Sequence, residues 1–323
     1  MATYKQIQGT AVQNYTNDPA NPVEGQLWYN DTANSFKYSS VTTSGSWATG
    51  GNMNSGRFVL GSMGTQDSAL GVGGITTVLT SATELYDGTS WTEVNDLNTA
   101  RQGFACGGIQ TSGVAFGGYI ATVQSLTESW NGTSWTEVSD LNSTRYTLEG
   151  TGSSNTNAIA FAGIIPPTTG ATEKWNGSSW TEVSDLNTAR YALAGAGADN
   201  TSAIAVGGSN PATFGGSGAF TEIWNDTSWT EVADLNVGRG GGLGGAGTVT
   251  STLVFGSPTQ TESWNGTSWT VDTALNTGRT ELGDAGANNT SALAFGGEGP
   301  PVLTATEEFT GAGSPLTKTI TTS

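Results

Sequence analysis

Short apolar segments and short alternating segments, separated by turn residues, recur along most of the chain. Within residues 102–138, QGFACGGI and GVAFGG are runs of small and apolar residues, whereas TESW and SWTEV alternate polar and apolar positions. Asn131-Gly132, between the last two, is a strong hairpin signal because both residues tolerate positive φ. None of these segments has helical periodicity. The pattern predicts four short strands, here called a to d in chain order.

The same order of segments is found in the other units. Strand b recurs at ALGVGG (69–74), AIAFAG (158–163), AIAVGG (203–208), TLVFGS (252–257) and ALAFGG (292–297). Strand c recurs at TELY (83–86), TEKW (172–175), TEIW (221–224), TESW (261–264) and TEEF (306–309). A period of 40 to 49 residues between arginines indicates stacked supersecondary units. The repeat predicts an all-β fold, a six-bladed β-propeller with four antiparallel strands per blade.

The strand d segments indicate how this propeller would close. Five of them follow their own strand c, but GSWAT (45–49) precedes every complete blade. We expect GSWAT to pair with TEEF, and joining Trp47 to Phe309 closes a loop of 309 − 47 = 262 residues at a cost of roughly 5 kcal/mol. The alternative is that PLTKTITT (315–322) completes the last blade locally. The predicted organisation is an N-terminal arm and hairpin (1–44), a propeller (45–310) and a C-terminal tail (311–323).

One arginine and one glutamate recur at fixed positions of every unit. The arginines are Arg57, Arg101, Arg145, Arg190, Arg239 and Arg279. The glutamates of strand c are Glu84, Glu128, Glu173, Glu222, Glu262 and Glu307. Because an unpaired buried charge is very costly, we expect each arginine to fork onto a strand-c glutamate or onto loop carbonyls. The alternative is a ring of six cations that captures an anion.

Composition and charge narrow the class of protein. The 323 residues include 11 tryptophans, and 48 glycines against only 9 prolines, so the chain should bury a core. The net charge of −17 argues against nucleic acid and anionic membrane surfaces as partners. No leader and no apolar run of ~20 residues is present, so we expect a protein made in a cytoplasm without membrane insertion.

Catalytic chemistry is poorly supported. The chain has no histidine, which removes a Ser/His/Asp triad, His-ligated metals and the usual general base. Cys106 is the single cysteine and sits among small residues, where a buried inert thiol is expected. A calcium site in GADNTS (197–202) is an alternative to the polar turn that we favour there. We expect no enzyme activity and no cofactor.

The repeat resembles the kelch repeat. A glycine doublet, an acidic residue before Tyr or Trp, Asp/Asn-Gly, Trp, Leu and Arg follow in that order, as in GG (73–74), ELYDGTSW (84–91) and DLNTAR (96–101). The resemblance covers about residues 45–310. It implies a kelch-like propeller, although Phe309 replaces the strand-c Tyr or Trp in the last unit.

The N-terminal segment has a resemblance of its own. NPVEGQLWYNDTANSFKYSS (21–40) resembles a hairpin module near the start of bacteriophage tail-fibre and other virion proteins, with strands at 27–29 and 36–38. The low content of charged residues in the blades is similar to that of marine phage structural proteins that carry kelch-like repeats. The alternative is an ordinary hairpin that leads into the propeller.

The connections between strands b and c vary most in length, from 3 to 12 residues. They share one face with the d–a loops, and insertions in repeat proteins gather on the face that often binds. The kelch resemblance implies the same face. The candidate contact residues are Tyr119, Ile164, Pro166, Phe214, Phe220 and Leu303. The alternative for each is a loop residue folded onto its own blade.

These observations lead to a functional expectation. The chain would be a non-enzymatic virion structural protein of a bacteriophage, made in the host bacterial cytoplasm and present in several copies per particle. Residues 1–44 would bind other virion proteins, and the propeller would bind a host-surface glycan or protein as part of a tail fibre. The alternatives are a capsid-decorating or head-fibre protein, and a non-viral lectin-like or protein-interaction propeller.

Overall fold

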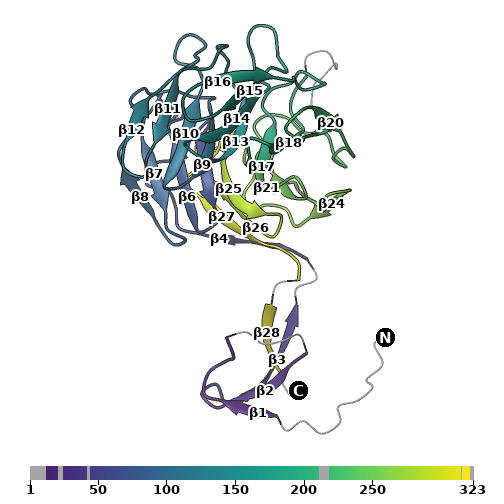
Figure 1. Cartoon of the computed structure of the whole chain (residues 1–323). Helices are drawn as coiled ribbons and strands as arrows, with labels where there is room; N and C mark the ends of the chain where they lie inside the picture. The colour runs from purple at the N-terminus through teal and green to yellow at the C-terminus, as the bar shows by residue number, and fades with distance from the viewer. Residues whose placement is uncertain (1–11, 21–24, 42–43, 211–217, 314, 321–323) are drawn as a thin grey trace. The chain divides into compact units, whose positions relative to one another are not determined.

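Strands make up the regular structure of the chain. The computed structural model describes residues 12–20, 25–41, 44–210, 218–313 and 315–320, and within these ranges there is no helix. The chain divides into two compact units (Figure 1). The small unit comprises Met1–Gly45 and Gly311–Ser323, and the repeat unit comprises Ser46–Thr310. The predicted all-β class is confirmed.

Each sheet of the repeat unit has four strands in the order a, b, c, d. The a strands are β5 (Gly61–Thr65), β9 (Ala105–Ile109), β13 (Glu149–Ser154), β17 (Ala194–Asp199), β21 (Gly244–Thr248) and β25 (Gly283–Asn288). The b strands are β6 (Ser68–Val72), β10 (Ser112–Phe116), β14 (Asn157–Phe161), β18 (Ser202–Val206), β22 (Ser251–Phe255) and β26 (Ser291–Phe295).

The outer strands complete the sheets. The c strands are β7 (Thr83–Tyr86), β11 (Thr127–Trp130), β15 (Thr172–Trp175), β19 (Thr221–Trp224), β23 (Thr261–Trp264) and β27 (Thr306–Thr310). The d strands are β8 (Trp91–Val94), β12 (Trp135–Glu137), β16 (Trp180–Val183), β20 (Trp229–Glu231), β24 (Trp269–Asp272) and β4 (Ser46–Thr49). Repeated antiparallel four-stranded sheets are consistent with a β-propeller-like repeat fold.

The c–d turns form for the reason that the sequence indicates. Gly132 has a φ of 89°, a conformation that costs glycine little. The Asn131 side chain accepts hydrogen bonds from the N–H groups of Thr133 and Ser134, both at 2.9 Å. This local bonding fixes the tight reversal between β11 and β12.

The first strand of the repeat unit pairs with its last. β4 lies antiparallel to β27, and Trp47 stands opposite Phe309. β28 (Pro315–Thr319), the segment that could have completed this sheet instead, pairs with a strand of the small unit. The d position beside β27 is therefore filled from a distant part of the sequence.

The a strands contact one another between sheets. Each touches the a strands of two other sheets, in the order β5, β9, β13, β17, β21, β25 and again β5. Small residues dominate these strands, and this allows the backbones of neighbouring sheets to approach closely. Atoms that belong to six sheets thereby surround one central region.

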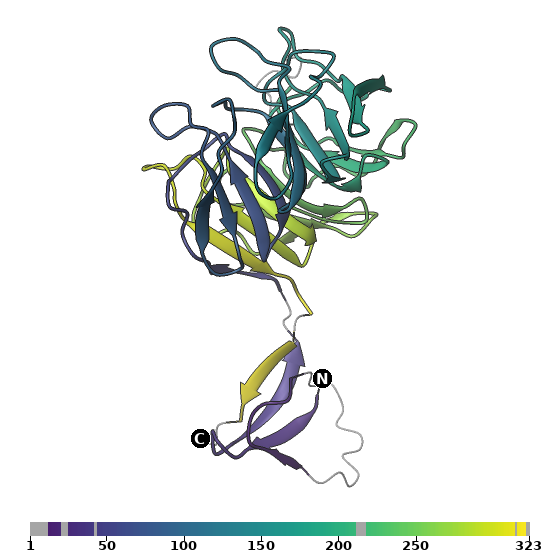
Figure 2. The ribbon, with the colours of Figure 1, turned by 60° about the vertical axis from the view of Figure 1, so that its left-hand side comes forward.

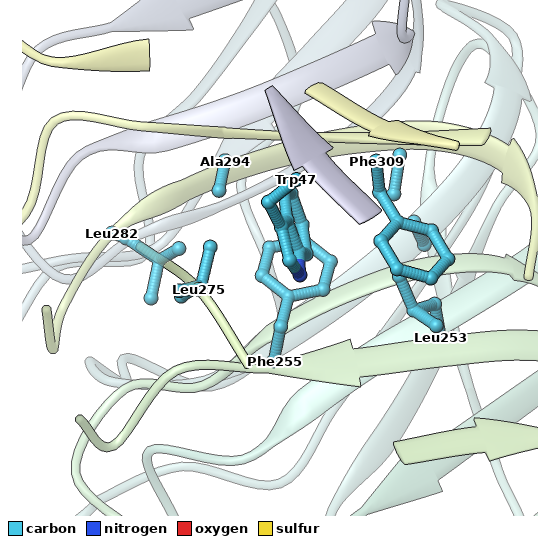
Figure 3. Close-up of a cluster of buried hydrophobic side chains, with 9 residues drawn as sticks. Trp47, Leu253, Phe255, Leu275, Leu282, Ala294 and Phe309 are labelled. Carbon is cyan, nitrogen blue, oxygen red and sulfur yellow. The ribbon is translucent and has the colours of Figure 1, made fainter. Parts of the chain in front are cut away.

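Tryptophans join neighbouring sheets. Trp47 of β4 packs edge-on against Phe255 of β22 and against Phe309 of its own sheet, with ring centroids 5.0 Å apart in both pairs (Figure 3). The indole N–H of Trp47 also donates to the Thr261 hydroxyl, 3.2 Å away in the neighbouring sheet. Trp91, Trp180, Trp229 and Trp269 make the equivalent bond to a c-strand threonine. These rings serve as packing between sheets.

The small unit is a single four-stranded sheet. Its strand order is β1 (Gln13–Tyr15), β2 (Leu27–Asn30), β3 (Ser35–Val41) and β28. β2 and β3 form the predicted hairpin, with Leu27 opposite Tyr38 and Tyr29 opposite Phe36, and this prediction is confirmed. β1 adds to β2 in parallel, and β28 adds to β3 in antiparallel fashion, as the turned view in Figure 2 shows for β28.

The C-terminal segment 311–323, predicted as a tail, contains a strand of the small unit. Residues 315–319 supply the fourth strand of the small unit, with Thr317 opposite Ser39 and Lys318 opposite Tyr38. The physical reason is that β3 has only one partner within the N-terminal hairpin. Its other edge carries unpaired backbone groups, which β28 satisfies.

Candidate functional site

The a strands are built mainly from very small residues, with two acidic exceptions. Opposite the last residue of each b strand stand Gly61, Ala105, Glu149, Ala194, Gly244 and Gly283. One residue further along stand Ser62, Cys106, Gly150, Gly195, Gly245 and Asp284. Glu149 and Asp284 are thus the carboxylates at positions where the other copies hold Gly, Ala, Ser or Cys.

The two carboxylates line one central cavity. Its volume is about 260 Å³, and residues from all six a strands form its wall, including Met63, Cys106 and Thr151. β13 and β25, which carry Glu149 and Asp284, are separated by two other a strands in either direction. The carboxylates therefore approach the cavity from opposite sides.

Asp284 links the strands on either side of its own. The Ser62 hydroxyl of β5 donates to Asp284 Oδ1 at 2.7 Å, and the Gly245 N–H of β21 donates to Oδ2. Burial raises the pKa of Asp284 to about 6, although both hydrogen bonds favour its ionised form. Burial therefore favours the protonated form of this carboxyl group.

Glu149 lies against the next a strand. A Cβ atom on Gly195 would lie 2.4 Å from Glu149 Cγ, so only glycine leaves room for this side chain. Burial raises the pKa of Glu149 well above its ordinary value, and the charge of Asp284 raises it further. Only the Gly150 N–H, 2.9 Å from Oε1, opposes this shift. The pair can hold a proton inside the cavity.

A ring of backbone hydrogen bonds lies beside the a strands. The residue two positions before each a strand donates its N–H to its counterpart in another sheet, over distances of 2.7 to 3.3 Å. The successive members are Val59, Gly103, Thr147, Ala192, Gly242 and Glu281, and the N–H of Val59 completes the cycle by donating to the carbonyl of Glu281. These residues line a second cavity, of about 60 Å³, which Glu149 also borders.

All six ring residues have positive φ. The values are 52° for Val59, 59° for Gly103, 47° for Thr147, 50° for Ala192, 71° for Gly242 and 52° for Glu281. This region strains side chains with a Cβ, most of all the β-branched Val59 and Thr147. The ring bonds that this conformation allows offset the strain. Burial and the nearby Glu298 raise the pKa of Glu281, the acidic member.

The recurrent arginines and glutamates form six buried ion pairs. Distances between Nη and Oε1 include 2.9 Å for Arg57–Glu84, 2.7 Å for Arg145–Glu173, 3.0 Å for Arg239–Glu262 and 2.7 Å for Arg279–Glu307. Arg101–Glu128 and Arg190–Glu222 make the same contact. These are the pairs predicted from the repeat. The arginines are 0% to 3% exposed, whereas the anion-capturing alternative needs guanidinium groups open to solvent.

Each pair also fixes the loop that precedes an a strand. Glu128 Oε2 accepts 2.7 Å and 2.9 Å bonds from the backbone and side chain of Asn98, in the same loop as Arg101. Arg101 donates further to the carbonyls of Thr99 and Ala115. The glutamate therefore binds a loop as a whole, because it satisfies both a guanidinium and a backbone N–H.

The predicted b–c loop residues lie in separate loops. Tyr119 is half-buried, and its ring centroid is 5.4 Å from that of Tyr146 in the neighbouring d–a loop. Ile164 is half-buried and forms an isolated bridge with the same Tyr146, while Pro166 is exposed. The structure thus brings Tyr119 and Ile164 to a common neighbour, which sequence reasoning missed.

The remaining predicted contact residues are not gathered with these. Phe220 and Leu303 are half-buried in the loops of two other sheets, with Phe220 against Gly218 and Leu303 against Gly299. Phe214 lies outside the described residues. The described candidates are therefore spread over four sheets and form no single pocket.

Other candidate chemistry is used locally. Asp199 Oδ1 accepts from the backbone and hydroxyl of Thr201, as in a polar turn. The Cys106 thiol is buried, and this burial raises its pKa. In the described ranges, no group of three or more His, Cys, Asp or Glu residues could hold a metal ion. Within those ranges there is also no helix of sufficient length and apolarity to span a bilayer.

Comparisons with family models and with curated proteins add no relative. No family model matches the chain, and no curated protein shows significant similarity to it. The kelch and virion resemblances therefore rest on the motifs quoted above.

Proposed function

We propose that the chain is a non-enzymatic bacteriophage virion protein that attaches to the host surface as part of a tail fibre. The observation that carries this proposal is the division into a small unit and a repeat unit with very different charge. The repeat unit contains 7 basic and 24 acidic residues, a net charge of −17, whereas the small unit contains 3 of each and is neutral.

The repeat unit would be a six-bladed kelch-like propeller closed by the N-terminal strand β4. Three findings support this architecture. β4 pairs with β27, the a strands contact one another in cyclic order, and the backbone ring passes through all six sheets. A rigid body of this kind can present loops without rearranging its core.

The small unit would be the anchor to other virion proteins. It contains the hairpin that resembles a virion module, and its sheet takes strands from both ends of the described chain. Since the residues before β4 and after β27 both join this sheet, the repeat unit is connected to the small unit at two points of the chain. A double connection suits a body that must withstand pulling during attachment.

The b–c loop face would contact a host glycan or protein. Tyr119, Tyr146 and Ile164 support this part of the proposal, because half-buried aromatic and apolar side chains on loops are typical of recognition surfaces. Pro166, Phe220 and Leu303 are further candidates on the loops of this face, and Phe214 is a candidate from the sequence alone. Multiple copies per particle would multiply a weak individual contact.

Immunogold labelling of purified particles tests this function. Antibodies against the repeat unit should label tail fibres. Labelling confined to capsids would contradict the attachment function and favour the capsid-decorating or head-fibre alternative. Particles without any label would contradict the virion proposal and favour a non-viral binding propeller.

A glycan array with the full chain tests the binding face. Tyr119→Ala should weaken binding to a responding host polysaccharide about tenfold, the scale of one aromatic contact. The matched control is Thr133→Ala in the c–d turn of the same sheet, which should bind like the wild type. Equal loss in both variants would contradict the assignment of the face.

A further inference from the structure

The two faces of the small sheet are unlike. On one face, Trp28 is 0% exposed and stands opposite Lys37. Asp18 lies over this face and accepts hydrogen bonds from the Trp28 indole at 3.0 Å, the Asn30 amide at 2.6 Å and the Lys37 ammonium at 2.8 Å. These bonds lower the pKa of Asp18 to about 2. We call this side the covered face.

The other side, the apolar face, carries hydrophobic residues on β2 and β3 and at the residues next to β1 and β28. Leu27 stands opposite Tyr38, and Tyr29 stands opposite Phe36 with ring centroids 4.9 Å apart. Register places Val12 beside Leu27, since Gln13 pairs with Trp28. Ile320 lies beside Phe36, to whose carbonyl it donates its N–H at 2.9 Å. The apolar face comprises Val12, Leu27, Tyr29, Phe36, Tyr38 and Ile320.

The apolar face is open to solvent. Val12 and Leu27 are each 38% exposed, Phe36 is 47% exposed and Ile320 is 45% exposed. These are four of the eight large hydrophobic side chains that are exposed in the described residues, in a unit of less than a fifth of the chain. A sheet normally buries its apolar face against a second layer. The described residues of this unit supply no such layer.

Charge indicates what can cover this face. The repeat unit, at −17, repels another copy of itself, whereas the neutral small unit does not. Among the described residues, the one charged side chain that register places on the apolar face is Lys318, opposite Tyr38. A nearly uncharged apolar patch is complementary to an identical patch, and a two-fold contact brings the same residues of both copies together.

We propose that two copies of the chain associate through the apolar faces of their small units. Face-to-face packing of two such sheets forms a two-layer sandwich with its layers about 10 Å apart. Leu27 and Phe36 lie at the centre of the patch on β2 and β3 and contribute most to the contact. This association does not depend on the attachment function.

Light scattering on the full chain during gel filtration measures the association. The wild type should elute at twice its 33.0 kDa mass. The double variant Leu27→Ser with Phe36→Ser should associate about a hundredfold more weakly and elute at the single-chain mass. A wild type at 33.0 kDa at every concentration, or a double variant with the wild-type mass, would overturn the proposal.

The matched control removes exposed hydrophobic residues from the repeat unit. Val78 and Val271 are 68% and 65% exposed, more than any residue of the apolar face. Val78→Ser with Val271→Ser should retain the wild-type mass. If this control also dissociates, general surface hydrophobicity rather than the apolar face drives association.

Cysteine cross-linking keeps the test independent of how well the serine variant folds. Cys106 is buried, so a cysteine introduced by Phe36→Cys is the accessible thiol, and a flexible bismaleimide should join two chains. Val78→Cys should give no cross-linked pair. Failure of Phe36→Cys to cross-link would refute the contact.

The outcomes also separate this inference from the proposed function. If the wild type is a single chain but the double variant no longer joins particles, the apolar face binds a different virion protein and the second-copy proposal fails. If the wild type is paired but no particle carries the protein, the pairing stands and the virion function fails.

Discussion

The six arginine–glutamate pairs of the repeat unit and the Lys37–Asp18 pair of the small unit lie in different environments. Arg145 and Glu173 are 0% and 1% exposed, whereas Lys37 and Asp18 of the small unit are 16% and 34% exposed. When a buried pair is broken, the remaining charge stays without water, but a partly exposed charge is resolvated. A buried arginine–glutamate pair therefore stabilises loops of the repeat unit, whereas the Lys37–Asp18 pair only orders side chains at the surface of the small unit.

The largest expected effect comes from breaking one buried pair. Arg145→Met leaves Glu173 desolvated and unpaired, and we expect the free energy of unfolding to fall by about 3–5 kcal/mol. Urea unfolding followed by tryptophan fluorescence measures it. Lys37→Met, the small-unit counterpart, should cause a change too small to resolve, and equal losses would refute the distinction. Adding Glu173→Met to Arg145→Met should recover part of the stability.

Removal of Trp47, which joins β4 to its neighbours, tests whether the sheet that contains β4 is as stable as the sheets formed from one continuous segment. Trp47→Ala deletes contacts with Phe255 and Phe309 and should destabilise the repeat unit by about 3–5 kcal/mol. Trp229→Ala, at the equivalent position of a locally formed sheet, should cost a similar amount. Chemical denaturation of both variants tests this, and a clearly smaller loss for Trp47→Ala would mean that the β4 sheet opens independently of the others.

The central carboxylates should make stability depend on pH. Because burial raises the pKa of Glu149, its protonated form is favoured in the folded state. This contribution is fully present below the unfolded pKa of about 4.3 and is lost as pH rises through the folded pKa. Glu149→Gln should therefore stabilise the protein at pH 8 by at least about 1 kcal/mol and have little effect at pH 4.

Thermal unfolding across this pH range measures the Glu149 effect. The control is Glu93→Gln, which alters an exposed carboxylate of β8 and should leave the profile unchanged. A Glu149→Gln variant that is less stable than the wild type at pH 8 would contradict the account of the cavity.

The smallest expected effect lies in the backbone ring, where equivalent positions hold different residues. Val59→Gly relieves a strained φ of 52°. After subtraction of the extra backbone entropy that glycine loses on folding, the free energy of unfolding should rise by about 1 kcal/mol. Gly103→Val, at a φ of 59°, should lower the free energy of unfolding by a similar amount. The added Cβ would make only ordinary van der Waals contacts, so the loss would come from φ. Denaturation experiments measure both changes. If both variants raise the free energy of unfolding, or both lower it, packing rather than φ determines the stability of the ring.

The sequence predicted what each repeat determines locally. Trp135, Arg145 and Asn131-Gly132 recur at fixed offsets, so strands, turns and ion pairs follow from one unit and extend to the rest. The role of β28 could not be predicted, because its Thr-Lys-Thr alternation fits any free strand edge. Its partner, the second edge of β3, becomes available only when the distant hairpin forms.

Part of the candidate site could be predicted from the sequence. Glu149 and Asp284 stand out once the a strands are aligned, since the other copies hold very small residues there. Their meeting in one cavity depends on which sheets face one another, and no local pattern contains that information. The apolar face of the small unit likewise requires the register of β1 and β28, which lie outside the hairpin and pair with its two strands.

The backbone ring limits how a gene of this kind can change in length. Its six links use only N–H and carbonyl groups, so almost any substitution leaves them in place. Gain or loss of one whole unit, however, would change the angle between every pair of neighbouring sheets and leave the last donor facing the wrong acceptor. Diversity can therefore accumulate more readily by insertion in the outer loops than by a change in the number of units that these backbone bonds join.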